Sequence, residues 1–133
     1  MVSIKSLAVA TLAAAPTAMG YITNLTAPAE AAAGSNITAT LQTAIYNQNW
    51  VDFGIVWGLA KPEYAYGDAV GTQVGYTALT GKEGLEYPYT FTEDVSIPET
   101  FTGDYVLRAA IPYLVGASGE LHFNIFSVNL TIS

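Results

Sequence analysis

The strongest constraint on the fold is an alternation of apolar and polar residues with a period of two, the period of a half-buried β-strand. It is clearest at residues 35–46 and 51–59, where apolar side chains recur at nearly every second position. No segment from Tyr21 onward has apolar residues at the three- and four-residue spacing of an amphipathic helix. The pattern therefore predicts an all-β protein.

Further strands are predicted at residues 21–25, 72–79, 87–97, 104–114 and 121–132, which brings the total to about seven. The polar connection at 46–50 has the length that joins antiparallel strands, so the segments flanking it are predicted to form a hairpin. In the last strand the apolar parity changes between Ile125 and Phe126, which predicts a β-bulge near Phe126 and Ser127. This spacing favours an immunoglobulin-like antiparallel β-sandwich of two sheets.

Two aromatic residues fit this fold class. Trp57 lies in an early central strand and is predicted to be a core aromatic, and Tyr105 opens a late strand in the manner of a tyrosine corner. The chain has no cysteine, although 51% of its residues are apolar, so it has no disulfides and must be held by its hydrophobic core. Without cysteine it is neither a thiol enzyme nor a Cys-ligated zinc module.

The first 20 residues have the layout of a secretory signal peptide. Lys5 precedes an apolar stretch at 7–15, and the small residues Ala18 and Gly20 suit a cleavage site after Gly20. A membrane anchor is the alternative, but the apolar stretch is much shorter than the roughly 20 residues that span a bilayer. We expect a signal peptide at 1–20, one domain at 21–133, and no membrane insertion.

Secretion makes three Asn-X-Thr sequons candidate sites of N-linked glycosylation. They begin at Asn24, Asn36 and Asn129, and each predicts an N-linked glycan on a solvent-facing asparagine.

The charge balance excludes two classes of partner. The chain has 4 Lys and Arg against 11 Asp and Glu, for a net charge of −7. It therefore lacks the positive surface that would neutralise a nucleic-acid backbone or dock on anionic lipid.

A search for catalytic groups finds little. His122 is the only histidine, and its alternation with Leu121 and Phe123 places it on a solvent face. The sequence has no nucleophile motif for which this histidine could act as the base. The carboxylates that could perform acid–base chemistry fall mostly in loops or at strand ends: Glu83, Glu86, Glu93, Asp94, Glu99 and Asp104. Glu93, Asp94 and Asp104 lie at predicted strand ends, where carboxylates could bind calcium, but there is no EF-hand pattern. We expect no enzyme activity, metal or cofactor.

Tyrosines concentrate in two predicted loops, at 61–68 and 86–89. Tyrosine in loops provides rigid, amphipathic contact area for a partner or a sugar. Alternatively, these rings cap the open ends of the sandwich core. The predicted partner-binding residues are Tyr64, Tyr66, Tyr87 and Tyr89, with Glu63 and Asp68 providing charge toward a basic partner face.

Four segments, in order along the chain, resemble the fungal necrosis-inducing secreted proteins, small effectors of plant-associated fungi. They are VDFGIVWG at 51–58, VSIPE at 95–99, DYVLRAAIPYLVGAS at 104–118 and SVNLTI at 127–132. The resemblance implies secretion into the host apoplast, action in plant cells, association with immune receptor-like kinases, and suppression of pattern-triggered immunity or induction of cell death. It brings no catalytic residues. It also implies a C-terminal tail in longer members, which leaves any tail-dependent activity open for this chain.

Two other classes stand beside this interpretation. A secreted carbohydrate-binding or structural module of the cell wall or adhesion surface would share the sandwich and the aromatic loops. An enzyme is disfavoured, because a nucleophile, a base and metal ligands are missing from the sequence. We expect the protein to be a monomer.

Overall fold

The computed structural model describes residues 20–45, 50–79 and 90–133, and these residues are almost entirely β-structure. The all-β prediction is confirmed. The only helix among them is a single 3-10 turn, η1 (Pro62–Tyr64). The strands are β1 (Gly20–Thr26), β2 (Glu30–Ala31), β3 (Asn36–Ile45), β4 (Trp50–Asp52), β5 (Gly54–Ala60), β6 (Thr72–Ala78), β7 (Thr90–Ser96), β8 (Gly103–Val115) and β9 (Glu120–Ile132).

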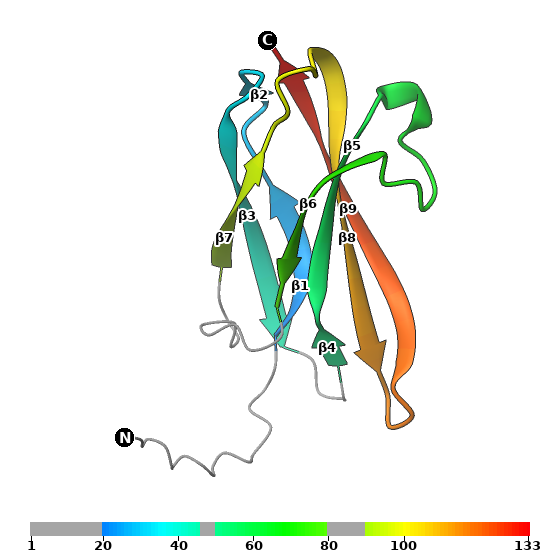
Figure 1. Cartoon of the computed structure of the whole chain (residues 1–133). Coiled ribbons are helices and arrows are strands. Elements are labelled where there is room, and N and C mark those ends of the chain that lie inside the picture. Colours follow the sequence, from blue (N-terminus) through cyan, green and yellow to red (C-terminus); the bar gives the residue numbers. More distant parts are fainter. Residues whose placement is uncertain (1–19, 46–49, 80–89) are drawn as a thin grey trace.

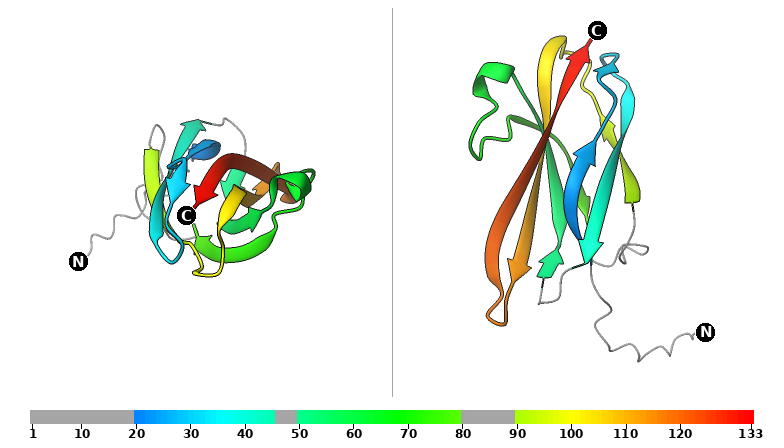
Figure 2. Two further views of the ribbon diagram at one scale, coloured as in Figure 1. Left: turned by 90° about the horizontal axis from the view of Figure 1, so that it is seen from above. Right: turned by 180° about the vertical axis from the view of Figure 1, so that it is seen from behind.

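The strands form two sheets that face each other (Figure 1). The smaller sheet has the order β1-β3-β7, and the larger has the order β2-β9-β8-β5-β6, with β4 also paired to β8. All pairs are antiparallel except β2 with β9, which run parallel through Ala31 and Ile132. Viewed along the strands, the larger sheet curls around one side of the core (Figure 2, left). The immunoglobulin-like sandwich is thus confirmed.

The core lies between the inner faces of the two sheets. The alternating apolar residues of β3, β5 and β8 meet there, and the Trp57 side chain is only 1% exposed. The indole Nε1 of Trp57 donates a hydrogen bond to Thr77 Oγ1 on β6 at 2.9 Å, so burial of the ring leaves its polar atom paired. The prediction for Trp57 is confirmed. The fully buried side chains include Leu41, Ile55, Leu59, Leu107, Ile111 and Leu130.

The predicted hairpin between residues 35–46 and 51–59 is wrong. β3 pairs with β1 and β7, which occupy both of its edges, and β5 pairs with β6 and β8 in the other sheet. The alternation shows that each strand has one apolar face, and that face is buried by packing against the opposite sheet. It does not show which strand lies beside it in its own sheet. Face-to-face packing is what the sandwich requires of these two strands.

The predicted bulge near Phe126 and Ser127 is also wrong. β8 and β9 stay in one continuous register from Gly103 opposite Ile132 to Val115 opposite Glu120. Leu121 and Phe123 therefore lie on the outer face, where they are 52% and 60% exposed. The β8–β9 hairpin extends past the end of the smaller sheet (Figures 1 and 2), so no inner core forces these side chains inward.

Tyr105 follows only part of its prediction. Its ring packs against the core and lies 5.2 Å from the ring of Phe101. In the described part of the chain, however, its hydroxyl makes no hydrogen bond to upstream backbone, so the hydrogen bond of a tyrosine corner is not formed there. Tyr105 also lines a pocket at this end of the sandwich.

Candidate partner-binding surface

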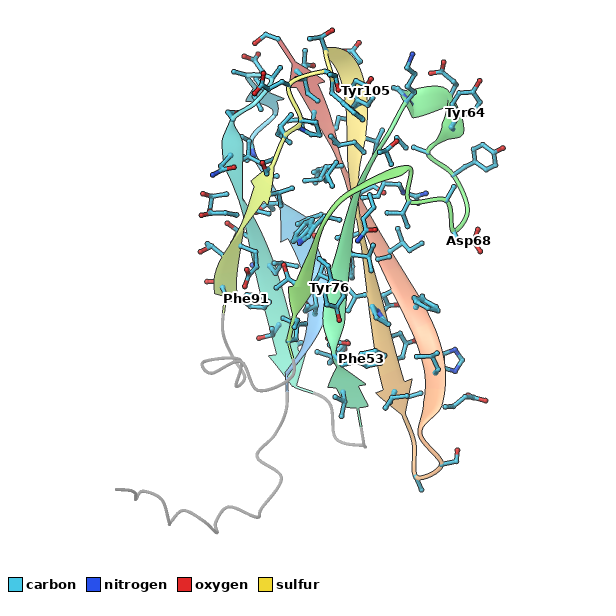
Figure 3. The ribbon with its side chains drawn as sticks, viewed as in Figure 1. Phe53, Tyr64, Asp68, Tyr76, Phe91 and Tyr105 are labelled. Carbon is cyan, nitrogen blue, oxygen red and sulfur yellow. The ribbon has the colours of Figure 1, made fainter. Side chains whose placement is uncertain are left out.

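The segment at 61–71 joins β5 to β6 and folds over the outer face of the larger sheet (Figure 1). Pro62 begins η1, where its fixed φ suits the first helical position, and Tyr64 N–H donates to Lys61 O at 2.9 Å. Tyr64 and Tyr66 are 63% and 69% exposed, and Figure 3 shows Tyr64 and Asp68 in this segment. This segment, called here the tyrosine loop, therefore presents two rings to solvent.

Arg108 holds the tyrosine loop to the sheet. It lies in the middle of β8 with its side chain on the outer face, yet it is only 7% exposed because the loop covers it. Its Nη1 donates to the carbonyl oxygens of Tyr66 (3.2 Å) and Ala69, and its Nη2 donates to Gly67 O (3.1 Å). Its Nε donates to Ser127 Oγ on β9 at 2.9 Å. One buried cation thus forms hydrogen bonds with three backbone carbonyl groups of the loop.

Close backbone contacts at two glycines complete the docking of the tyrosine loop. A Cβ atom at Gly58 on β5 would lie 2.3 Å from the carbonyl oxygen of Val70. Gly71 has a φ of +91°, and a Cβ atom there would lie 2.3 Å from Leu59 O. Only glycine permits both the conformation at Gly71 and the approach of the loop to β5.

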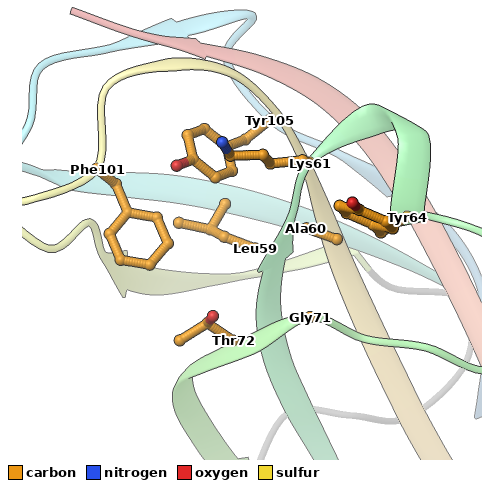
Figure 4. Close-up of a pocket in the computed structure, with 8 residues that line it drawn as sticks. All are labelled: Leu59, Ala60, Lys61, Tyr64, Gly71, Thr72, Phe101 and Tyr105. Carbon is orange, nitrogen blue, oxygen red and sulfur yellow. The ribbon is translucent and has the colours of Figure 1, made fainter.

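A pocket of about 290 Å³ lies beside the tyrosine loop (Figure 4). Its walls are mainly the apolar and aromatic side chains of Leu59, Tyr64, Phe101 and Tyr105, and Lys61 adds one ammonium group at the rim. Such a site suits an apolar or aromatic side chain of a partner, with a carboxylate or carbonyl placed near the lysine.

The structure brings together four of the six predicted partner-binding residues. Tyr64, Tyr66, Glu63 and Asp68 all lie exposed in the tyrosine loop. Both rings are mostly exposed and neither belongs to the core cluster, while Tyr64 also borders the core residue Leu59 in the pocket. The other two, Tyr87 and Tyr89, fall outside the described residues. That any of these six residues binds a partner stays a prediction.

Sequence reasoning missed the residues that support the tyrosine loop. Arg108 was not singled out, although a single charge in the apolar segment 105–112 was a signal for it. A buried arginine must be paired or hydrogen bonded, so its position in such a strand implies a covering segment with free carbonyl groups. The pocket residues Lys61 and Phe101 come from segments far apart in the sequence, and no local pattern joins them.

Comparison with known proteins assigns the chain to a family. The model of the Nis1 family matches residues 18–131. The chain belongs to the Nis1 family. This Nis1 protein is also 31% identical over 106 residues to Necrosis-inducing secreted protein 1 of Colletotrichum higginsianum, a match that covers 79% of this chain and 73% of that protein. The predicted resemblance is confirmed.

Solved structures similar to this Nis1 protein share less with it. A superoxide reductase (neelaredoxin) from Ignicoccus hospitalis matches with a TM-score of 0.48 and 13% identity, over 92% of this chain and 87% of the other. A lytic polysaccharide monooxygenase of the AA10 class from Streptomyces lividans matches with a TM-score of 0.47 and 15% identity, over 77% and 57%. At this level of similarity they carry no information on activity.

Ionisable groups on this Nis1 protein do not gather into a metal site within the described residues. His122 is exposed, as predicted; its ring stacks on Tyr113 with centroids 5.6 Å apart, and its Nε2 lies 2.7 Å from Glu120 Oε1. The placement of Leu121 and Phe123 is the opposite of that predicted, since they too are exposed. In the same residues, no helix has the length and apolar character needed to cross a membrane.

The three sequons of this Nis1 protein support a prediction about modification. Asn24, Asn36 and Asn129 are all exposed, as a glycosylated asparagine must be. We expect the protein secreted by a fungal host to lose mass on treatment with peptide N-glycosidase F. Replacing each asparagine with glutamine in turn should remove one glycan at a time in intact-mass spectra. A mass equal to that of the bare polypeptide would contradict the prediction for all three sites.

Proposed function

We propose that this Nis1 family protein is a secreted necrosis-inducing effector that acts by binding a host protein through the tyrosine loop. The name of its Colletotrichum relative supports secretion and a necrosis-inducing role. The layout of residues 1–20 supports secretion independently. The proposed host partners are immune receptor-like kinases, and the proposed outcome is suppression of pattern-triggered immunity or host cell death.

The observation that carries this proposal is the way Arg108 fixes the tyrosine loop. Interfaces gain affinity when the contact residues are already ordered in the free protein, because less conformational entropy is lost on binding. Hydrogen bonds from one guanidinium group to three loop carbonyls provide that order, while Tyr64 and Tyr66 remain open to solvent. Tyrosine is also enriched among residues that dominate binding energy.

Replacing both exposed rings tests this function. We expect the Tyr64→Ala, Tyr66→Ala double variant to bind its kinase partner at least about tenfold more weakly, since each lost anchor costs on the order of 1–2 kcal/mol. The measurement is co-immunoprecipitation from leaves with a panel of receptor-like kinase domains, followed by titration of the kinase recovered. A flagellin-triggered oxidative burst is recorded in the same leaves, and the double variant should restore it.

Two variants serve as controls for this test. Tyr76→Ala removes an exposed ring of the same type from β6, outside the loop, and should leave binding unchanged. Tyr64→Phe with Tyr66→Phe keeps the rings and should retain most of the affinity. Unchanged kinase binding by the folded double alanine variant would disprove the role of the loop. Retention on chitin, glucan or cellulose, with no kinase recovered, would favour the wall-binding module.

A further inference from the structure

The outward edge of β9 is the longest unpaired strand edge in the described part of the chain. β9 pairs with β8 along all of its 13 residues. On its other side, β2 covers it only at Thr131 and Ile132. From Glu120 to Leu130, therefore, no strand among the described residues is paired with this edge.

Two hydrogen bonds establish which backbone groups face this edge. The N–H of Thr131 donates to Ala29 O at 2.9 Å, on the side away from β8. Pro112 O accepts from Phe53 N–H at 3.2 Å, so the backbone of Pro112 points away from its partner across the ladder, Phe123. In an antiparallel pair, the backbone groups of two such opposing residues both point outward. The N–H and C=O groups of Phe123 therefore face the free edge.

Because the register is continuous and the period is two, the same holds for Leu121 and Ile125. The side chains of these residues all lie on the outer face of the sheet. Leu121 is opposite Leu114, and Leu114 is opposite Val51 on β4, so three partly exposed apolar side chains form one row. Phe123 lies beside that row, opposite Pro112. Unpaired backbone groups and exposed apolar side chains thus coincide at one place.

This edge lacks the usual protection against pairing. Native sheets protect an exposed edge with lysine, proline or a bulge, because unpaired backbone groups form a template for another strand. Residues 120–132 contain neither lysine nor proline, and the β8–β9 register has no shift. Glu120 is the only carboxylate in the segment. Such an unprotected edge in a secreted protein is suited to a partner that adds a strand to the sheet.

We propose that the β9 edge at residues 121–127 binds an extended, basic segment of a partner protein as an added β-strand. Backbone hydrogen bonds would supply affinity, and alternate apolar side chains of the segment would pack on Leu121 and Phe123. The basic character follows from charge: the chain carries 11 acidic and 4 basic side chains, so it attracts a cationic segment. A second copy of the chain brings the same net charge of −7 and is therefore disfavoured. This site is separate from the tyrosine loop.

The test uses the full gene product, recovered from the medium of a fungal expression host, and three labelled ten-residue peptides. One alternates valine with lysine, one alternates valine with glutamate, and one is the lysine peptide with every second amide N-methylated. We expect fluorescence anisotropy to show that the lysine peptide binds about tenfold or more tightly than either of the other two peptides. Amide hydrogen exchange of Leu121, Phe123 and Ile125 should be fast in the free protein and slow with the lysine peptide.

Two variants make the assignment specific to this edge. Ile125→Pro removes an outward N–H without breaking a bond to β8, and should weaken the lysine peptide about tenfold. Phe123→Lys places a charge on the same face, which should oppose the addition of a strand. It serves as the test if the proline variant does not fold. Tyr76→Lys, which adds the same charge on β6, should bind as the unmodified protein does.

Three results would overturn the proposal. Equal binding of the glutamate peptide would remove the basic requirement. Binding that survives both Phe123→Lys and N-methylation would show that the edge does not pair. Sedimentation of the unmodified protein as a dimer that Phe123→Lys converts to monomer would assign the edge to a second copy of the chain. None of these results depends on the kinase assays, so each proposal can fail alone.

Discussion

Replacement of Arg108 by alanine is expected to lower the free energy of unfolding by about 3 kcal/mol. The guanidinium donates to the carbonyl groups of Tyr66, Gly67 and Ala69, and its removal leaves these acceptors unpaired beneath the loop. Hydrogen bonds to a charged group are worth roughly twice those between neutral groups. Urea unfolding followed by tryptophan fluorescence measures the loss, and limited proteolysis should show new cleavage within residues 61–71.

Two milder variants separate the contributions of Arg108. Ser127→Ala removes only the acceptor of Nε and should cost about 1 kcal/mol, without new cleavage in the tyrosine loop. Arg108→Lys keeps the charge but loses the planar fork that reaches several carbonyls, so it should resemble the alanine variant in the proteolysis assay. An alanine variant as stable and as protease-resistant as the unmodified protein would refute the role assigned to Arg108. Kinase binding should fall with loop order, because the tyrosines would lose their fixed positions.

The strand positions were predictable because alternation is a local property. The segments predicted near 72–79 and 104–114 appear as β6 and β8, and Trp57 is buried as its parity indicated. Pairing was less predictable, because alternation states that one face is buried but not what buries it. The immunoglobulin-like topology itself places the strands at 35–46 and 51–59 in opposite sheets, so the predicted hairpin conflicted with the predicted fold.

The functional surfaces were harder to predict for a related reason. The exposure of Tyr64 and Tyr66 followed from turn-forming neighbours, but the order of their loop depends on Arg108, more than 40 positions later. Leu121 and Phe123 were assigned to the core because they are apolar and alternate. The β8–β9 hairpin extends past the smaller sheet, so their burial depends on a boundary that no local pattern encodes. Violations of local rules are expected where a surface has a function.

Truncation of Trp57 to alanine should have the largest effect on stability, a loss of about 4 kcal/mol. The ring is 1% exposed at the centre of the core, and its removal leaves a cavity bordered by both sheets as well as an unused hydroxyl on Thr77. The free energy of unfolding of a domain of this size is roughly 5–15 kcal/mol in total. This chain also has no disulfide to limit the entropy of the unfolded state. We expect the secreted yield of the Trp57→Ala variant to fall steeply. Protein expressed at low temperature should unfold at a much lower urea concentration than the unmodified protein.

The same site offers a way to divide the Trp57 effect into packing and hydrogen bonding. Thr77→Val removes the acceptor of the indole N–H while keeping the shape of the side chain, and should cost about 1–2 kcal/mol. Trp57→Phe keeps an aromatic ring in the core and should lie between the valine and alanine variants. If Trp57→Ala were less destabilising than Thr77→Val, the core would not be centred on this ring. Since the tyrosine loop and the β9 edge both belong to the larger sheet that Trp57 anchors, its loss should reduce binding at both surfaces together.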